Sequence, residues 1–463
     1  MSISVKAEDD IKDTLAIQEE AAKELFQVDL DHLDPALELR KKIGGIDRQT
    51  DDSQSQLPDR PIGRVPRVIP NSRIRRYRKQ LITPRAAWTR VTSALVELRL
   101  ERLYDHQLYG SAAFRLAPLD SYDAQFEEFC ELVEMGDIDL IYEFARKHPL
   151  HVDALLVVSD FMRISSASDA LELTERAVYI LEKCTLATSE TGVDLTAGTL
   201  RLPYDEFDNR RMHLALLRYI QFLTKNGCYR TALEYSKILW SLDPWLDPVG
   251  VRMIADLLAL QSGQYDWFTT VYTGHVKREA AWLANWHFSN ALMHFIRGEG
   301  QEEADGLLQR AILENPWMVP KLADACGLQI HEASWLSSFR LPSLASSDHV
   351  TSLREALAKI YAQRVGPVWK VQQNRAWLEA NLGIAISCRL SSSQEASLDA
   401  IDYRPSVLEA ASVWRHAMVS DLTGVQVALP TRIAPTVGHL YDPLPPEMLG
   451  DASETLSSRC HIQ

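Results

Sequence analysis

Residues 226–244 read NGCYRTALEYSKILWSLDP, and this stretch decides the fold class. Gly227, Tyr229, Ala232 and Pro244 stand in the spacing G-x-Y-x2-A-x11-P, which is typical of the second half of a repeated helix pair. Glycine permits a tight turn between two helices, and a small alanine allows them to approach closely. Proline ends the second helix because it cannot continue the hydrogen-bond ladder.

The first helix of the pair precedes this stretch, as HLALLRYIQFLTKNG, with Leu216, Tyr219, Ile220 and Leu223 on one face. Three further stretches fit the same frame. Their marker residues are Phe161, Ala170 and Ala177 in the first, Gly263 and Tyr265 in the second, and Phe295, Ala304, Ala311 and Pro316 in the third. The repeats predict an all-α fold, a tetratricopeptide-like α-solenoid of helical hairpins.

The N-terminal region is expected to be irregular and partly disordered. Residues 6–26 have the pattern of an acidic amphipathic helix, and Asp34 and Pro35 suit the start of a second helix that Gly44-Gly45 would stop. Four prolines then forbid a continuous helix over residues 46–72.

We expect four segments along the chain. These are N-terminal helices (1–45), a basic linker rich in proline and arginine (46–92), the solenoid (93–383), and a C-terminal helical and extended segment (384–463). Helical patterns dominate residues 92–345 and continue over 346–383, where strand-like alternation is scarce.

Charge is distributed unevenly along the chain. The net charge is −14, but residues 60–90 hold ten Lys or Arg and no Asp or Glu, so the remaining residues carry −14 − 10 = −24. Overall acidity argues against general nucleic-acid binding. The basic run is either a solvated, import-like linker or a phosphate contact in which Tyr77 can stack on a base. The candidate phosphate contacts are Arg73, Arg75, Arg76, Arg78 and Lys79.

No residue pattern indicates chemistry. The six cysteines include no CxxC pair, and Cys228 has no histidine within its turn, so we expect no zinc site and no catalytic thiol. His148 and His151 suit a capping or surface role rather than metal binding, and Trp282, Trp286 and Phe288 suit core packing. Phosphate-binding and hydrolase motifs are missing, so we expect no enzyme, no cofactor and no metal.

Neither a secretory signal nor a membrane span is expected. The first residues, MSISVKAEDDIKD, are acidic and lack an apolar centre. No apolar run reaches the ~18 residues of a transmembrane helix.

Three segments in this order carry a family resemblance: HVDALLVVSD, LTAGTLRLPYDEFDNRRMHLALLRY and NGCYRTALEYSKILWSLDP. HLDPALELRKKIGG, TPRAAW, YAQRVGPVWK and YDPLPP support it. Together they resemble the transcription factor 25 family, also called ribosome quality control complex subunit 1. The matching residues, structural or partner-binding, are His151, Asp153, Leu195, Gly198, Arg201, Asn209, Arg210, Gly227, Ala232, Tyr235 and Pro244.

The resemblance implies a non-catalytic adaptor, cytoplasmic and ribosome-associated. Its implied partners are the large ribosomal subunit with its ribosomal RNA and stalled nascent chain, the E3 ligase Listerin, the nuclear export mediator factor, ubiquitin and the AAA+ unfoldase valosin-containing protein. The adaptor would assist ubiquitination of the stalled chain and recruit the unfoldase for its extraction and degradation. A nuclear transcriptional repressor that uses residues 60–90 stays open as the alternative.

Overall fold

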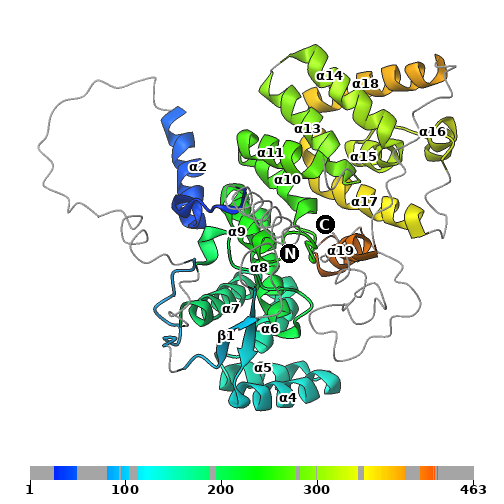
Figure 1. Ribbon diagram of the computed structural model, residues 1–463. Coiled ribbons are helices and arrows are strands. Elements are labelled where there is room, and N and C mark those ends of the chain that lie inside the picture. Colours follow the sequence, from blue (N-terminus) through cyan, green and yellow to red (C-terminus); the bar gives the residue numbers. More distant parts are fainter. Residues whose placement is uncertain are drawn as a thin grey trace, which may run out of the picture. The chain divides into compact units, whose positions relative to one another are not determined.

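The computed structural model describes residues 25–49, 81–92, 95–103, 113–187, 194–277, 282–298, 300–341, 349–391, 407–420, 422 and 425. The chain divides into two compact units, Met1–Leu242 (unit 1) and Asp243–Gln463 (unit 2). Most of the described residues are helical (Figure 1), which confirms the all-α expectation in its general form. No helix among them is both long enough and apolar enough to cross a membrane.

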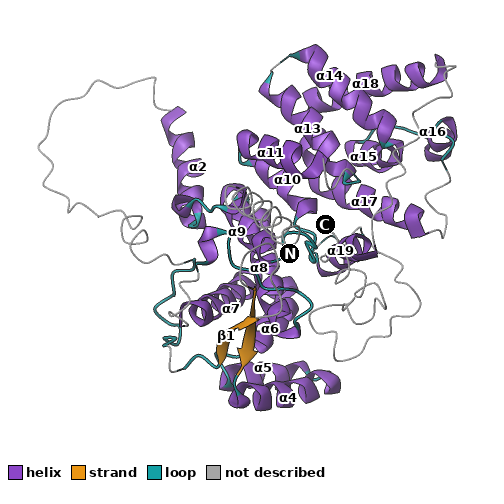
Figure 2. Ribbon diagram, in the orientation of Figure 1, coloured by secondary structure: helices purple, strands orange, loops and turns teal. Residues whose placement is uncertain are grey.

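Unit 1 contains the following larger elements (Figure 2): α2 (Pro35–Gln49), β1 (Leu98–Leu103), β2 (Ala113–Pro118), α4 (Asp120–Met135), α5 (Ile138–Lys147), α6 (Val152–Ser165), α7 (Ala167–Ala187), α8 (Arg210–Lys225) and α9 (Tyr229–Leu242). Its short 3-10 turns are η1 (Leu30–His32), η3 (Leu195–Ala197) and η4 (Phe207–Asn209).

Helix α2 starts where the sequence predicts and ends later. The Asp34 carboxylate accepts a hydrogen bond from the backbone N–H of Ala36 at 3.0 Å, so it caps the first turn. The helix continues through Gly44 and Gly45, and the predicted stop there is wrong. Glycine costs a helix about 1 kcal/mol but, unlike proline, it removes no hydrogen bond, so the helix can continue past the pair.

The two-stranded sheet lies in a stretch predicted as helical, and that prediction is wrong here. β1 and β2 pair in antiparallel register, with Leu98 opposite Pro118 and Leu103 opposite Ala113. Leu98 and Leu100 are buried and the residue between them is exposed, which is the period-two pattern of a half-buried strand. Strands of six residues carry too few alternations to stand out among long helical patterns.

The turn between α8 and α9 has the geometry that the opening motif predicts. Gly227 adopts the left-handed conformation, with φ 75°. The N–H of Gly227 donates to the carbonyl of Thr224 at 3.0 Å, and the N–H of Cys228 donates to that of Leu223 at 2.8 Å. Helix α9 ends two residues before Pro244.

Unit 2 contains α10 (Arg252–Gln261), α11 (Tyr265–Val271), the π-helical turn η5 (Tyr272–Val276), α13 (Ala284–Arg297), α14 (Gln301–Glu314), the 3-10 turn η6 (Pro316–Met318), α15 (Val319–Cys326), α16 (Glu332–Ser338), α17 (His349–Trp369), α18 (Gln372–Ser391) and α19 (Val407–Val419).

The three other predicted repeats each form two helices that pack against each other: α6 with α7, α10 with α11, and α13 with α14. Ala170, Ala177, Ala304 and Ala311 are buried, in keeping with close helix approach. Phe161 instead lies at the surface of α6, with 44% of its side chain exposed.

The stacking of the pairs is less regular than in a simple solenoid. In a solenoid each repeat contacts only its neighbours. Helix α17 packs not only against α15 and α19 but also against α10 and α13, which lie much earlier in the chain. The tetratricopeptide-like solenoid therefore stays a prediction, as do the four segment boundaries.

The interior of unit 2 combines apolar side chains with buried polar groups. Trp282, Trp286 and Phe288 are buried, as expected of core residues. The Trp286 indole N–H donates to the carbonyl of Arg252 at 2.8 Å. Burial, with the nearby Arg364, lowers the pKa of His416 to about 3, so this core histidine is neutral near pH 7.

Candidate functional site: a strap across the motif residues of unit 1

The predicted phosphate contacts lie outside the described residues, so their role stays a prediction. The family-motif residues are all described, and all of them except Pro244 lie within unit 1, where two groups stand out. One group forms a buried polar core. The other group underlies a segment from the start of the chain.

The polar core is centred on Asp153. This carboxylate, fully buried, accepts a hydrogen bond from the Tyr122 hydroxyl at 2.8 Å and lies 3.4 Å from the Arg211 guanidinium. A buried charge needs a partner of opposite sign, because leaving water costs several kcal/mol. Asp153 and Arg211 therefore fasten α6 to α8.

His151 caps α6, as the sequence predicts. Its Nδ1 accepts a hydrogen bond from the N–H of Ala154 at 3.2 Å, and its ring stacks on Tyr122 with 4.6 Å between centroids. Burial lowers the pKa of His151 to about 4, so the ring is neutral near pH 7 and carries its proton on Nε2. No group of three or more potential metal ligands occurs among the described residues.

Asn209 joins the sheet to the loop before α8. Its side-chain oxygen accepts from the N–H of Leu116 at 3.0 Å, and its amide nitrogen donates to the carbonyls of Phe114 and Pro203 at 3.0 and 2.9 Å. Three simultaneous hydrogen bonds explain why an asparagine is needed at this position.

Two motif arginines donate hydrogen bonds to backbone carbonyls. Arg201 donates to the carbonyls of Gly198 and Ser241 at 2.8 and 2.7 Å. Arg210 donates to the carbonyl of Tyr204 at 3.1 Å. Both side chains are fully buried, so they are not available to a partner.

The second group of motif residues holds residues 25–43, which we call the strap. Phe26 packs edge-on against Trp240 of α9, with ring centroids 5.5 Å apart, and is buried. The backbone of Val28 donates to the carbonyl of Thr196 at 3.3 Å. Gly198 has φ 70°, and a Cβ there would lie 2.7 Å from the Cβ of Phe26. The LTAGTL motif is thus the seat of Phe26.

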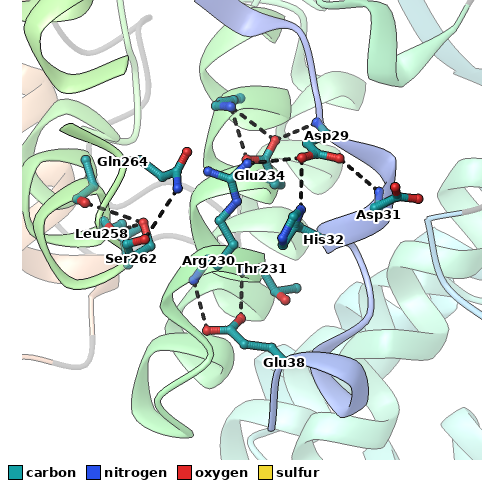
Figure 3. Close-up of polar contacts among 12 residues, drawn as sticks. Asp29, Asp31, His32, Glu38, Arg230, Thr231, Glu234, Leu258, Ser262 and Gln264 are labelled. Atoms are coloured by element: carbon teal, nitrogen blue, oxygen red, sulfur yellow. Dashed lines mark hydrogen bonds and ion pairs between the residues drawn. The ribbon is translucent and has the colours of Figure 1, made fainter. Parts of the chain in front are cut away.

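The middle of the strap meets charged residues of α9 (Figure 3). The N–H of Asp29 donates to the Glu234 carboxylate at 2.8 Å, and the Asp29 carboxylate pairs with Arg230 at 3.3 Å. Glu234 is fully buried and also pairs with Arg230 and with Lys237, each at 3.1 Å. The strap therefore completes the shell of donors around a buried carboxylate.

Helix α2 of the strap binds both sides of the α8–α9 turn. The Glu38 carboxylate accepts from the N–H groups of Arg230 and Thr231 at 3.1 and 2.9 Å (Figure 3). Lys42 donates to the carbonyl of Gly227 at 2.5 Å and pairs with Glu38 at 2.9 Å. An anion thus sits at the N-terminus of α9 and a cation at the C-terminal end of α8, as the two helix dipoles favour.

A second segment docks on the same unit. The N–H of Leu81 donates to the Glu182 carboxylate at 2.6 Å, and its carbonyl accepts from the Tyr235 hydroxyl at 2.8 Å. The Trp88 indole donates to Glu172 at 2.9 Å, and Arg85 pairs with that same carboxylate at 2.6 Å. The strap and residues 81–88, which lie before and after the candidate phosphate contacts in the sequence, are therefore both held by other residues of unit 1.

Sequence reasoning identified the motif residues but missed what they hold. Glu38 and Thr231 are 193 residues apart, and no periodicity links positions at that separation. The only signal was that both HLDPALELRKKIGG and the α9 motif matched the same family. Cys228, which lies at this turn, is buried, and burial raises the pKa of its thiol to about 11, consistent with an unreactive residue.

The fold and this site define a helical protein in which the strap and residues 81–88 are held against helices that carry the motif residues. The family model described as "Transcriptional repressor TCF25" matches residues 114–446, and the chain belongs to that family. No solved structure is significantly similar to the chain.

Curated relatives extend the similarity to nearly the whole chain. It is 28% identical over 440 residues to the human "Ribosome quality control complex subunit TCF25", covering 92% of the chain and 61% of that protein. It is 24% identical over 437 residues to "Ribosome quality control complex subunit 1" of Schizosaccharomyces pombe, covering 93% and 59%. A "Probable transcription factor claV" of Ampulloclitocybe clavipes is 27% identical over 357 residues, covering 70% and 44%. The chain thus spans about three fifths of the first two proteins.

The seat of Phe26 predicts a stability difference between two glycines. We expect Gly198→Ala to lose about 1–2 kcal/mol from the left-handed backbone and roughly 1–3 kcal/mol more from the collision with Phe26. Gly136→Ala is the matched control, because its φ is 68° and a Cβ would meet nothing within 4 Å. Urea unfolding measures both; equal losses would contradict the seat.

The strap should loosen in acid. Burial acts to raise the pKa of Glu38, but the N–H of Thr231, Lys42 and the N–H of Arg230 outweigh it, so its pKa is lowered. Ionised Glu38 therefore stabilises the docked strap when the pH is above the ordinary carboxylate pKa. This contribution is lost as the pH falls below about 4 and Glu38 takes up a proton. Amide hydrogen exchange, corrected for intrinsic rates, should show α2 losing protection in this range. Glu38→Gln should reduce the pH dependence, and greater protection in acid would contradict the assignment.

The buried Asp153–Arg211 pair predicts a large effect of removing one partner. Arg211→Met should lose roughly 3–5 kcal/mol of unfolding free energy, because it leaves a buried carboxylate without its cation. Adding Asp153→Asn should recover part of the loss, since asparagine keeps an acceptor for Tyr122 without the charge. Lys147→Met, in an exposed pair with Glu128, is the control and should change stability by under about 1 kcal/mol.

Proposed function

We propose that the chain is a non-catalytic adaptor subunit of the ribosome quality control complex on the large ribosomal subunit. The family match over residues 114–446 supports this most, together with relatives from human and Schizosaccharomyces pombe whose names call them subunits of the ribosome quality control complex. The motif residues also support it: their polar groups bind backbone carbonyls, helix ends and each other, which is the chemistry of a scaffold.

Such an adaptor would act by placement. Holding Listerin, ubiquitin and the stalled nascent chain together raises their effective concentration and needs no new chemistry. In this proposal the nuclear export mediator factor shares the large subunit, and valosin-containing protein is recruited to extract the ubiquitinated chain. The adaptor would be ribosome-associated in the cytoplasm.

The basic run would supply attachment to ribosomal RNA. Lys and Arg that neutralise phosphates release counterions, so binding weakens steeply as salt rises. Contacts on either side of the candidate cations in the sequence support this proposal, because the strap and residues 81–88 are both held on unit 1.

A second candidate is a nuclear transcriptional repressor. The family description and the relative from Ampulloclitocybe clavipes, with its transcription-factor name, favour it. Imaging separates the two candidates. A mainly nuclear chain that leaves the nucleus when the arginines of residues 60–90 become alanine would support the repressor.

Depletion tests the adaptor function directly. Removing the chain from cells with induced stalling should reduce Listerin-dependent ubiquitination of chains on large subunits. The proposal would be contradicted if depletion left ubiquitination unchanged and if, in undepleted cells, the chain were missing from large-subunit fractions.

Salt-dependent co-sedimentation tests the role of the basic run. Changing all five candidate cations (Arg73, Arg75, Arg76, Arg78 and Lys79) to glutamine should weaken binding to large subunits roughly tenfold or more near physiological salt. The slope of log affinity against log salt should fall by up to about 4, because fewer counterions are released.

The control for this variant changes the same amount of charge elsewhere. Five exposed cations in the described residues, changed to glutamine together, should leave the slope nearly unchanged: Arg99, Arg146, Lys225, Lys277 and Arg310. Equal loss of binding in both variants would mean that overall charge, and not the basic run, governs attachment.

A further inference from the structure

In residues 35–43, the part of α2 whose side chains are described, two charged side chains face the α8–α9 turn, two apolar side chains are exposed and Leu37 is half-buried. Glu38 and Lys42, one turn apart, face the α8–α9 turn. Leu39 and Ile43 are also one turn apart, and they are 36% and 63% exposed. A surface helix normally buries its apolar stripe, so the way α2 docks is unusual.

The two halves of the strap are held by different forces. Residues up to Leu33 are anchored by burial, since Phe26, Val28 and Leu33 are each at most 7% exposed. None of residues 35–43 is buried, and Glu38 and Lys42 hold α2 to the turn through hydrogen bonds and charge. These contacts are partly shielded, since the Glu38 side chain is 10% exposed, but no apolar side chain of residues 35–43 is buried, so we expect α2 to open more easily than the anchor.

The surface that α2 covers has a defined chemistry. It offers the N–H groups of Arg230 and Thr231 to a carboxylate, and the carbonyl of Gly227 to an ammonium group. The ring of Tyr229 lies under the Lys42 ammonium at 5.2 Å. These groups select an acid and a lysine one helical turn apart, the spacing Glu-x3-Lys.

We propose that the α8–α9 turn is a docking site for a helical Glu-x3-Lys segment of a partner protein, and that α2 is its exchangeable internal occupant. A second copy of this chain would offer only the same α2, and it would compete against a tethered α2 at millimolar effective concentration. A partner protein that makes further contacts with unit 1 beyond this segment gains binding free energy that the α2 of a second copy lacks, and it can therefore displace the tethered helix. This inference does not depend on the proposed function.

Exchange can be measured with the natural full chain and two variants of it. The probe is a fluorescein-labelled peptide of residues 34–49, kept helical by a covalent staple between positions 36 and 40 on the outward side. In the Glu38→Gln chain the tethered α2 is weakened, so the probe should bind at least tenfold more tightly than to the natural chain. The Leu39→Ser chain, altered on the outward side, should behave like the natural chain.

The probe carries its own control. A stapled peptide with Glu38→Gln should bind the Glu38→Gln chain at least tenfold more weakly than the natural peptide. The proposal fails if the natural peptide does not bind that chain, or if both peptides bind equally.

Two further measurements test whether α2 opens on its own and whether the chain pairs with itself. Amide exchange of α2 in the natural chain should be faster than that of α9, and equal opening free energies would mean that α2 leaves only on global unfolding. Light scattering should show a monomer at micromolar concentration. A dimer that disappears in the Glu38→Gln chain would contradict the proposal, because the occupant of the turn would then be the α2 of a second copy.

Discussion

Unit 1 depends on the burial of a charged helix. In α9 every residue from Thr231 to Leu242 is buried, including Glu234 and Lys237. A buried carboxylate requires donors all around it, and α9 alone cannot provide them. Lys237 and Arg230 supply two, and the backbone of Asp29 supplies another from a segment 205 residues away. The strap is therefore part of how this helix can be buried at all.

The sequence predicted local structure well and long-range structure poorly. The turn at Gly227 and the helix pairs follow from spacing over a few residues, where glycine, alanine and proline have direct steric roles. The small sheet was missed because its partners contribute only six residues each. The stop at Gly44-Gly45 was wrong because glycine weakens a helix without blocking it.

The candidate site shows the same division. Motif matching found Gly198, Gly227 and Tyr235 but gave no hint of why these residues occur together. The structure supplies the reason: Gly198 leaves room for Phe26, Gly227 accepts from Lys42, and Tyr235 donates to Leu81. Each contact joins positions at least 154 residues apart, so it has no periodicity to detect. The reason for each of these residues can be given only when the positions of both partners in the fold are known.

The attachment of the strap and of residues 81–88 also bears on how the candidate cations between them would bind phosphate. Helix α2 is held at the α8–α9 turn, and Leu81 is held by Glu182 and Tyr235. A segment held at both ends loses less conformational freedom on binding than a free tail does, because part of the entropy is already lost in closing the loop. Release of α2 removes one of these two attachments, so more conformational freedom would then be lost on binding.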